Sequence, residues 1–167
     1  SISADTRLTA DFEYLMEGRV TVGNGNGQLT TNNDGTLADG SAVQNVTLTI
    51  DAGVEIKGKT GTFANLLITR GSKIMAMGTK SQPIIMSSDD AGYDGSGEWG
   101  GLILHGYGRH NECEVGGSYC DIDSEGESGF AGGYNDDDSS GILNYVVVAE
   151  GGYEFSTGNE INGISLI

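Results

Sequence analysis

The sequence lacks three features that would each point to a protein class: long apolar runs, helical periodicity and proline. No apolar run approaches the roughly 18 residues of a membrane span, which argues against membrane insertion. No window sustains apolar side chains at a period of about 3.6 residues, so helices should be few. Glycine and the single proline make up 30 of 167 residues, below the roughly 25–30% typical of disordered chains, so the 29 glycines should mark turns in one folded domain.

Basic residues are also scarce, and they are unevenly placed. The chain carries 8 lysines and arginines against 24 aspartates and glutamates, a formal net charge of −16. Up to residue 80 the two signs almost balance, with seven basic and eight acidic side chains. From residue 81 onward, Arg109 stands alone against sixteen carboxylates. A surface of this sign repels polyanions, so neither nucleic acid nor an anionic membrane is expected as a partner.

Cysteine occurs twice, at Cys113 and Cys120, on either side of a short polar loop. We predict a disulfide between them; two free thiols are the alternative, and no second Cys/His pair has the spacing of a zinc site. The chain opens with Ser1 rather than Met, which is consistent with an exported protein that has lost its signal segment, or with an expressed fragment. Both features favour an extracellular setting.

The sequence does contain a series of short apolar bursts, rich in β-branched residues and bounded by Gly, Asp, Asn or Ser. The bursts lie at 46–50, 54–56, 66–68, 73–77, 84–86, 102–104, 145–148 and 164–167. Each has the length of a β-strand. Leu48, Leu66, Ile84 and Leu102 follow one another at steps of 18 residues. A fixed period of about 20 residues in strand-rich sequence indicates a solenoid, so we predict an all-β fold, a parallel β-helix whose coils repeat at this step.

Two regions interrupt the pattern. We assign residues 1–45, which contain a Gly/Asn/Thr-rich stretch, to an N-terminal cap. Residues 46–167 would then form the coils, with residues 105–141 as a long acidic loop insertion. The apolar strand at 164–167 ends without a polar cap, which favours a chain truncated at its C-terminus; stacking of the open end on another copy is the alternative.

Several longer segments of the chain are distinctive. They are LTIDAGVEIKG, LLITRGSKIMAMGT, QPIIMSS, GEWGGLILHG and GGYNDDDSSGILNYVVVAEGG, within residues 45–167. Together they resemble a group of secreted or cell-surface bacterial proteins, most specifically in the Trp-Gly-Gly strand followed by an acidic glycine-rich loop. The resemblance implies a right-handed parallel β-helix and an exported protein, either extracellular or on the bacterial cell surface. It implies no activity and therefore no catalytic residue.

The segment at 120–141 holds seven carboxylates and no basic side chain. Its opening, DIDSEG, matches the start of an EF-hand loop, but the twelfth position is Gly132 and no helices flank it, so an EF-hand is excluded. Two carboxylates about 4 Å apart repel by roughly 4 kcal/mol at an effective dielectric of 20, so a converged loop would need a cation. Calcium is the candidate cofactor, with a solvated acidic loop as the alternative. The candidate ligands are Asp121, Asp123, Glu125, Glu127, Asp136, Asp137 and Asp138.

A smaller acidic turn, DDAGYDGSGEWGG at residues 89–101, presents the same choice. Asp89, Asp90, Asp94 and Glu98 could bind a metal, but the glycines are better explained as a bend in the backbone. This bend would bring Trp99 onto the coil, where its ring packs and its N–H donates to a carbonyl oxygen.

Two kinds of side chain could act on carbohydrate. His105 and Arg109 could supply a general base and a basic group, as in β-helical polysaccharide lyases and hydrolases, but no motif supports them as catalytic residues. The structural alternative pairs Arg109 with a neighbouring acid. Tyr107, Tyr119 and Tyr134 lie beside glycines and acids and could bind glycans by stacking on sugar rings; covering the edge of the scaffold is their alternative role.

From these features we expect a non-catalytic extracellular module, structural or adhesive, whose acidic loops bind calcium or neutral glycans. Its expected partners are surface glycans, or other copies of the chain stacked end to end. A β-helical polysaccharide lyase or hydrolase is the alternative, and a subunit of a self-assembling extracellular filament is a third hypothesis. Acids converging with Arg109 or His105 in a groove would favour the enzyme, and contacts between the coils of different copies would favour the filament.

Overall fold

The structure is a computed structural model that describes residues 1–32, 34–117 and 120–167. Its regular secondary structure in these ranges consists of sixteen β-strands. Within the same ranges, no helix has the length and apolar character that crossing a membrane would require.

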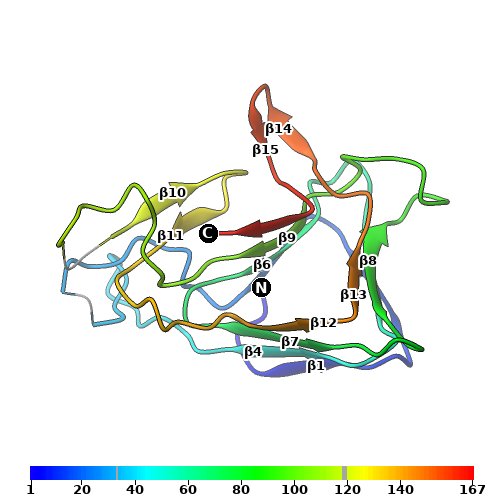
Figure 1. The fold of residues 1–167 in the computed structure, drawn as a ribbon, viewed down its shortest axis with the longest axis horizontal. Coiled ribbons are helices and arrows are strands. Elements are labelled where there is room, and N and C mark those ends of the chain that lie inside the picture. The colour runs from blue at the N-terminus through cyan, green and yellow to red at the C-terminus, as the bar shows by residue number, and fades with distance from the viewer. Residues whose placement is uncertain (33, 118–119) are drawn as a thin grey trace.

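Twelve of these strands form three parallel sheets of four strands each. The first sheet contains β1 (Thr6–Leu8), β4 (Thr47–Ile50), β7 (Lys73–Met77) and β12 (Gly141–Asn144). The second contains β2 (Glu13–Met16), β5 (Glu55–Gly58), β8 (Ile84–Ser88) and β13 (Val146–Val148). The third contains β3 (Arg19–Val22), β6 (Asn65–Ile68), β9 (Gly101–Leu104) and β16 (Ile164–Leu166). One strand from each sheet makes one coil, and the chain is a right-handed parallel β-helix (Figure 1), as predicted.

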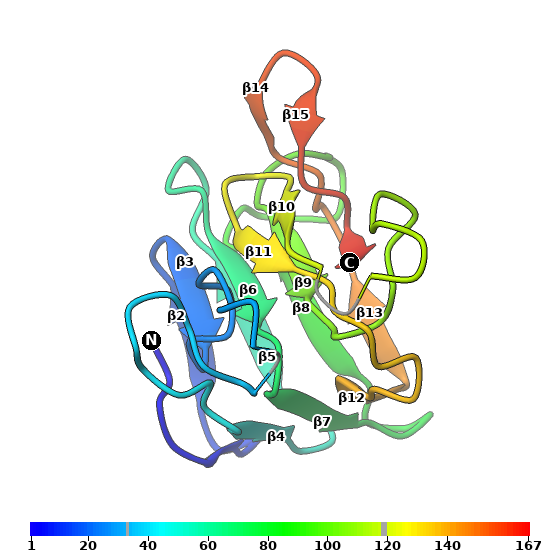
Figure 2. The same ribbon diagram turned by 90° about the vertical axis from the view of Figure 1, so that its left-hand side faces the viewer.

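The remaining four strands form two antiparallel hairpins. One pairs β10 (Ile122–Ser124) with β11 (Gly129–Ala131), and the other pairs β14 (Glu154–Ser156) with β15 (Asn159–Glu160). The first hairpin lies beside β6 and β9, whereas the second projects away from the stack of coils (Figure 1 and Figure 2). The first belongs to the predicted acidic insertion, which leaves the helix after β9 and returns at β12.

Apolar side chains that point into the coils form the core. In β4 and β5, alternate residues are buried, which is the two-residue period of a strand that is covered on one face. In β6 and β9 every residue is buried. The outer face of the third sheet is covered as well, since Leu67 and Ile103 pack with Ile161 in a second apolar cluster beside Phe155. The loops that follow β9 and β13 are therefore fixed on this sheet.

The predicted step of 18 residues is wrong as a description of how the coils stack. Three strands and their corners make up each coil, so 18 residues do not complete a turn and lead instead to a different sheet. Leu66, for example, belongs to the third sheet and Ile84 to the second. The stacked pairs are Leu48–Ile74, Ile56–Met86 and Leu66–Leu102, which lie 26, 30 and 36 residues apart.

The coils also begin earlier than the sequence indicated. β1, β2 and β3 pair in parallel with β4, β5 and β6, so residues 6–22 already form a complete coil rather than part of a cap. The burst pattern missed this coil because its strands are short and each carries charged or polar residues among the apolar ones. The Gly/Asn/Thr-rich stretch that follows β3 is a long connection between the first two coils.

At the other boundary of the insertion, one glycine lets the chain rejoin the helix. Gly141 opens β12 with a φ of 127°, and a Cβ there would overlap the carbonyl oxygen of Ile74 on the neighbouring strand β7. Side chains other than glycine would be strained at this φ and would push the two strands apart. The insertion can therefore return to the coil in register.

Candidate functional site

The acidic insertion is closed internally by a disulfide and is fixed to the helix by polar contacts. Cys113 and Cys120 form a disulfide, as predicted, with their Cα atoms 5.4 Å apart. The bond closes the loop that precedes the hairpin β10–β11.

The strongest polar attachment is Arg70, which lies at the corner between β6 and β7 and is completely buried. Its Nη1 donates to Asp121 Oδ1 at 2.7 Å and to the carbonyl oxygen of Gly132 at 3.0 Å. Its Nε and Nη2 donate to the carbonyl oxygens of Gly25 and Gly27. The Asp121 side chain is itself only 4% exposed. One guanidinium therefore joins the insertion, the first long connection and a coil corner.

A second arginine holds the tip of the hairpin. Arg19, on β3, donates to the carbonyl oxygens of Gly126 and Glu127 and, through Nε, to Asn65 Oδ1 at 2.9 Å. Asn65 lies opposite Arg19 on β6, the strand that pairs in parallel with β3. Arg70 thus neutralises one acid of the insertion, and Arg19 positions the turn of its hairpin.

His105 lies inside this attachment and is fully buried. Its Nε2 is 3.1 Å from Ser124 Oγ and 3.2 Å from Ser128 Oγ, both in the hairpin β10–β11 or its turn. Burial, and then the positive charge of nearby Arg70, lower the pKa of His105 to about 4. The imidazole is therefore neutral at neutral pH and joins the hairpin to the end of β9.

Arg109, the other residue considered for catalysis, is exposed and forms an ion pair with Asp136. Its hydrogen bonds lower the pKa of the Asp136 carboxyl. The two residues border a shallow cavity of about 350 Å³, and His105 is not among the residues that line it. The structure therefore does not bring the two catalytic candidates together in one groove.

The predicted calcium ligands are also separated. Asp121 is paired with Arg70, Asp136 with Arg109, and Asp138 accepts a hydrogen bond from the Tyr107 amide at 2.9 Å. The remaining four candidates, Asp123, Glu125, Glu127 and Asp137, are exposed. Among the described residues, they do not join any group of three or more acids whose oxygens converge.

Of the three tyrosines predicted to bind glycans, two are described and neither offers a free platform. Tyr107 is half-buried, with the Arg70 guanidinium 6.0 Å from the centre of its ring. The hydroxyl of Tyr134 donates to the carbonyl oxygen of Glu114 at 3.0 Å. Tyr119 lies outside the described residues.

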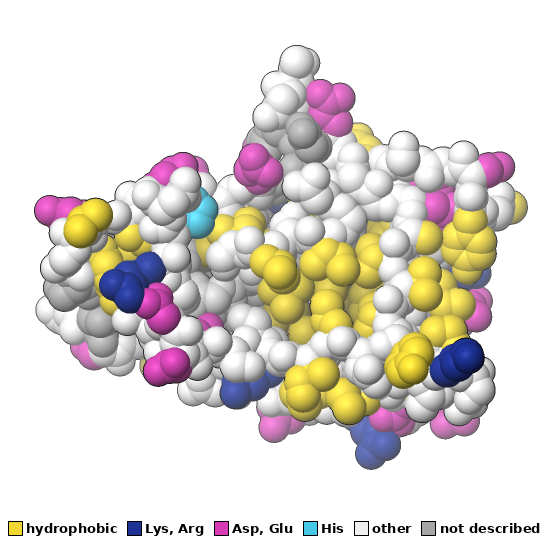
Figure 3. All heavy atoms as spheres, in the orientation of Figure 1, with side chains coloured by type: hydrophobic (Ala, Val, Ile, Leu, Met, Phe, Trp, Pro, Cys, Tyr) yellow, Lys and Arg dark blue, Asp and Glu magenta, His cyan; other side chains and the backbone are white. Residues whose placement is uncertain are grey.

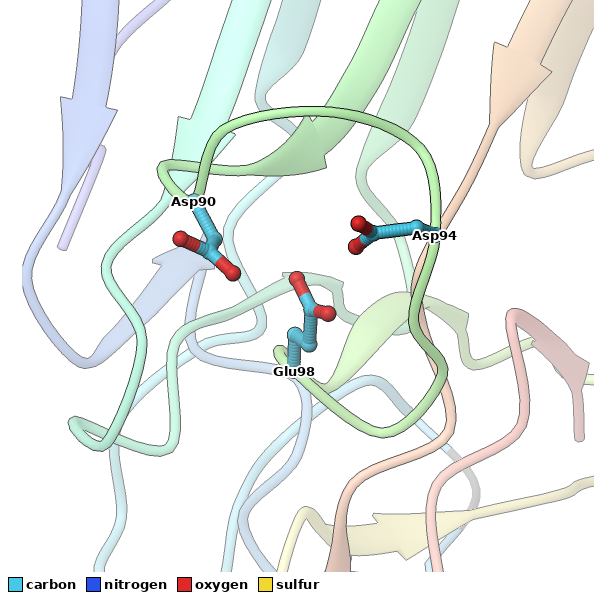
Figure 4. A group of neighbouring side chains, drawn as sticks. All are labelled: Asp90, Asp94 and Glu98. Atoms are coloured by element: carbon cyan, nitrogen blue, oxygen red, sulfur yellow. The ribbon is translucent and has the colours of Figure 1, made fainter.

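The acids that do converge lie in the loop between β8 and β9. Asp90, Asp94 and Glu98 each offer a carboxylate oxygen, and these oxygens all lie within 4.8 Å of one another. Figure 4 shows the three carboxylates pointing into the space that the loop encloses. The glycines of the loop leave room for them, since a Cβ on Gly95 would overlap Glu98 Oε1. We call these three residues the loop cluster.

Three aromatic rings form another surface feature, on the outside of the third sheet. Phe63 stacks on Phe155 with ring centres 5.1 Å apart, and Tyr153 meets both rings edge to face. Phe63 is 45% exposed. Beside these rings lies a cavity of about 390 Å³ whose lining is Arg19, Phe63, Asn65, Glu127, Phe155 and Ser156. We call this feature the aromatic pocket.

The fold agrees with a comparison against known families. Residues 21–167 match the family described as "Pectate-lyase like beta helix domain", which is well over half of the chain. The chain belongs to the pectate-lyase-like β-helix family. No curated protein and no solved structure matches it.

Sequence reasoning missed two features of this pectate-lyase-like β-helix. Arg70 follows the apolar strand LLI after a single threonine, and an arginine so close to a buried strand is a signal for a buried partner. The aromatic pocket could not be found from spacing, because Phe63 and Phe155 are brought together by stacking of the second coil against a loop of the fourth.

Proposed function

We propose that this chain is a non-catalytic extracellular module, structural or adhesive, built on a rigid β-helix. The observation that carries the proposal is the burial of the groups that an enzyme would use at its surface. His105 and Arg70 are fully buried and hold the insertion, and Asp121 forms an ion pair with Arg70. The disulfide between Cys113 and Cys120 fits an oxidising, extracellular setting.

For the adhesive role we propose neutral glycans as ligands and the aromatic pocket as their site. Exposed aromatic rings give a sugar the apolar surface on which its C–H face packs, and the exposed side chains of Ser156 and Glu127 offer polar atoms to hydroxyl groups. The acidic surface favours neutral sugars over uronates, since a sugar acid would be repelled. The calcium predicted for the insertion is not part of this proposal, because Asp121 and Asp136 already have cationic partners.

A binding and turnover assay on the whole chain, with its disulfide intact, tests this proposal. The protein should be retarded in native gels that contain a neutral polysaccharide, and it should release no reducing ends from neutral or acidic polysaccharides. Phe63→Ala should weaken binding about two- to tenfold, as expected for loss of one aromatic contact. Phe12→Ala removes an exposed ring that does not line the aromatic pocket and should have no effect.

Either of two results would count against it. Equal retardation of the Phe63→Ala and wild-type proteins would remove the aromatic pocket from the adhesive role. Cleavage of any polysaccharide that is lost in Arg109→Ala would establish the alternative, a β-helical lyase or hydrolase.

A second candidate function, end-to-end assembly, is favoured by the exposed end of the last coil. Ile164 and Leu166 on β16 pair with Leu102 and Leu104, whose side chains point into the core, and are 44% and 76% exposed. Figure 3 shows apolar side chains gathered inside the outline of this coil. At the other end, Ile2, Leu8 and Tyr14 line an apolar cavity of about 160 Å³. Stacking of one copy on another would cover both ends and pair their strands in parallel, a contact that does not close and so builds filaments.

Sedimentation velocity over a concentration series measures this assembly. We expect larger species at higher concentration for the wild type, and a monomer at all concentrations for Leu166→Lys. Val115→Lys places the same charge on a fully exposed residue of the insertion and should sediment like the wild type. A wild-type chain that stays monomeric throughout would exclude end-to-end assembly.

A further inference from the structure

The loop cluster of Asp90, Asp94 and Glu98 has a fourth carboxylate beneath it. Glu150, which follows β13, is 92% buried, as its 8% exposure shows. It is joined to the cluster by two contacts: its carbonyl oxygen accepts from the Glu98 amide at 2.9 Å, and its Oε2 lies 3.1 Å from Ser88 Oγ. Its other oxygen, Oε1, has no hydrogen-bond partner in the described part of the chain.

Ser88 joins the two glutamates. Its Oγ lies 2.5 Å from Glu98 Oε2, and its backbone N–H donates to Glu150 Oε2 at 3.1 Å. The hydroxyl carries one proton and lies nearer to Glu98 than to Glu150. The Asp90 amide donates to Ser88 Oγ and supplies no proton to either glutamate. In the described part of the chain, the oxygen left without a donor is therefore Oε1 of the buried Glu150.

No positive side chain compensates for these four carboxylates. Among the ion pairs of the described residues, none includes a member of the loop cluster or Glu150. Lys59, the base that acts on neighbouring Asp89, is paired with Glu17. Carboxylates that are partly buried and close together repel strongly unless a cation lies between them.

We infer that the loop between β8 and β9 binds a calcium ion through Asp90, Asp94 and Glu98, with buried Glu150 completing the negative charge from below. The donors are all carboxylate oxygens, which suit a hard cation. The loop is rich in glycine, so its backbone can adjust to the six to eight oxygens at irregular geometry that calcium takes, whereas magnesium demands a near-ideal octahedron. The bound ion would join the loop before β9 to the segment after β13, two parts of different coils.

This site lies apart from the aromatic pocket and from the acidic insertion, so it does not depend on the glycan-binding proposal. It also differs from the calcium site that the sequence indicated. A dissociation constant of about 0.1–1 mM is expected, as for other calcium sites on extracellular modules.

Calorimetric titration of the full-length, disulfide-intact chain with CaCl₂ tests the site, after treatment with a chelator and at fixed ionic strength. The wild type should bind one calcium ion and should bind MgCl₂ more weakly. The double variant Asp90→Asn/Asp94→Asn changes two exposed residues and should weaken calcium binding at least about tenfold. Asp123→Asn/Asp137→Asn makes the same change in charge on two exposed acids of the insertion and should bind calcium like the wild type.

A second measurement addresses Glu150 separately. In the chelator-treated protein, Glu150→Gln should raise the melting temperature, because it removes a buried charge that no basic side chain compensates; the further rise on adding calcium should shrink. No heat of binding in the wild type would overturn the inference. Binding that survives in Asp90→Asn/Asp94→Asn but is lost in Asp123→Asn/Asp137→Asn would also overturn it, in favour of a site in the insertion.

Discussion

Arg70→Met is expected to lower the free energy of unfolding by about 3–5 kcal/mol, the usual cost of removing one partner from a buried ion pair. The change leaves the Asp121 carboxylate, 4% exposed, without its counter-ion, and it removes the donor from three backbone carbonyl groups. Methionine keeps the side chain apolar and of similar length, so the loss reports the polar contacts more than a cavity. Urea denaturation followed by circular dichroism measures it.

Two controls separate this effect from a general response to charge removal. Arg109→Met breaks the exposed pair with Asp136 and should shift the denaturation midpoint far less, because water solvates both partners. Asp121→Asn added to Arg70→Met should recover part of the loss, since no buried charge then stays unpaired. If the two arginine variants were equally unstable, Arg70 would not be the main attachment of the insertion.

Limited proteolysis adds a local readout. Because Arg70 joins the insertion to a coil corner, its loss should expose the hairpin β10–β11 to cleavage before the coils unfold. The single variant Arg109→Met should be cleaved at the same rate as the wild type. This contrast ties the stability change to a named part of the molecule.

The fold class could be predicted from the sequence because it depends on local signals. Short β-branched bursts between glycines specify strands and corners wherever they occur in a coil. The register of the coils could not be predicted from the sequence. The corner loops differ in length, and the chain gives no local sign of which strand stacks on which. Leu48 stacks on Ile74 rather than taking part in an 18-residue repeat. The first coil was missed for a related reason, since polar residues interrupt its short strands.

The acidic residues show where local reasoning about a site fails. DIDSEG has a favourable ligand spacing, yet Asp121 turns inward to Arg70, a residue 51 positions away. The loop 89–101 has a less regular spacing, yet its three acids converge because Trp99 holds one end of it on the core. The spacing of acids along a loop predicts which carboxylates could converge. The contacts between the loop and the β-helix determine which carboxylates do converge.

The uneven distribution of charge along the chain corresponds to particular contacts in the structure. Arg19 and Arg70, from the first half, neutralise or position the start and the turn of the acidic hairpin. Among the ion pairs of the described residues, none includes a member of the loop cluster or Glu150. The residual acidity of the second half is therefore concentrated where we infer calcium, together with exposed acids on the insertion.

Trp99→Ala is the other change with a large expected effect, a loss of about 3–5 kcal/mol in the free energy of unfolding. Trp99 is fully buried, its ring packs against Gly58 on β5, and its Nε1 donates to the carbonyl oxygen of Ala149 at 2.7 Å. This is the packing and the hydrogen bond that the sequence predicted for it. Alanine leaves a cavity in the core and an unpaired carbonyl group, both of which thermal and urea denaturation would detect.

The hydrogen bond between Trp99 and Ala149 lies next to the proposed calcium site. Trp99 follows Glu98 and Ala149 precedes Glu150, so this contact supports the backbone hydrogen bond that joins the two glutamates. Trp99→Phe keeps a ring in the core and removes the donor; its stability loss should be smaller, about 1–3 kcal/mol, while its calcium affinity should fall. Leu67→Ala is the matched control, since it opens a cavity in the separate cluster with Ile103 and Ile161. It should destabilise the chain and leave calcium affinity unchanged, and an equal loss of affinity in both variants would mean that the site responds to general loosening of the core rather than to Trp99.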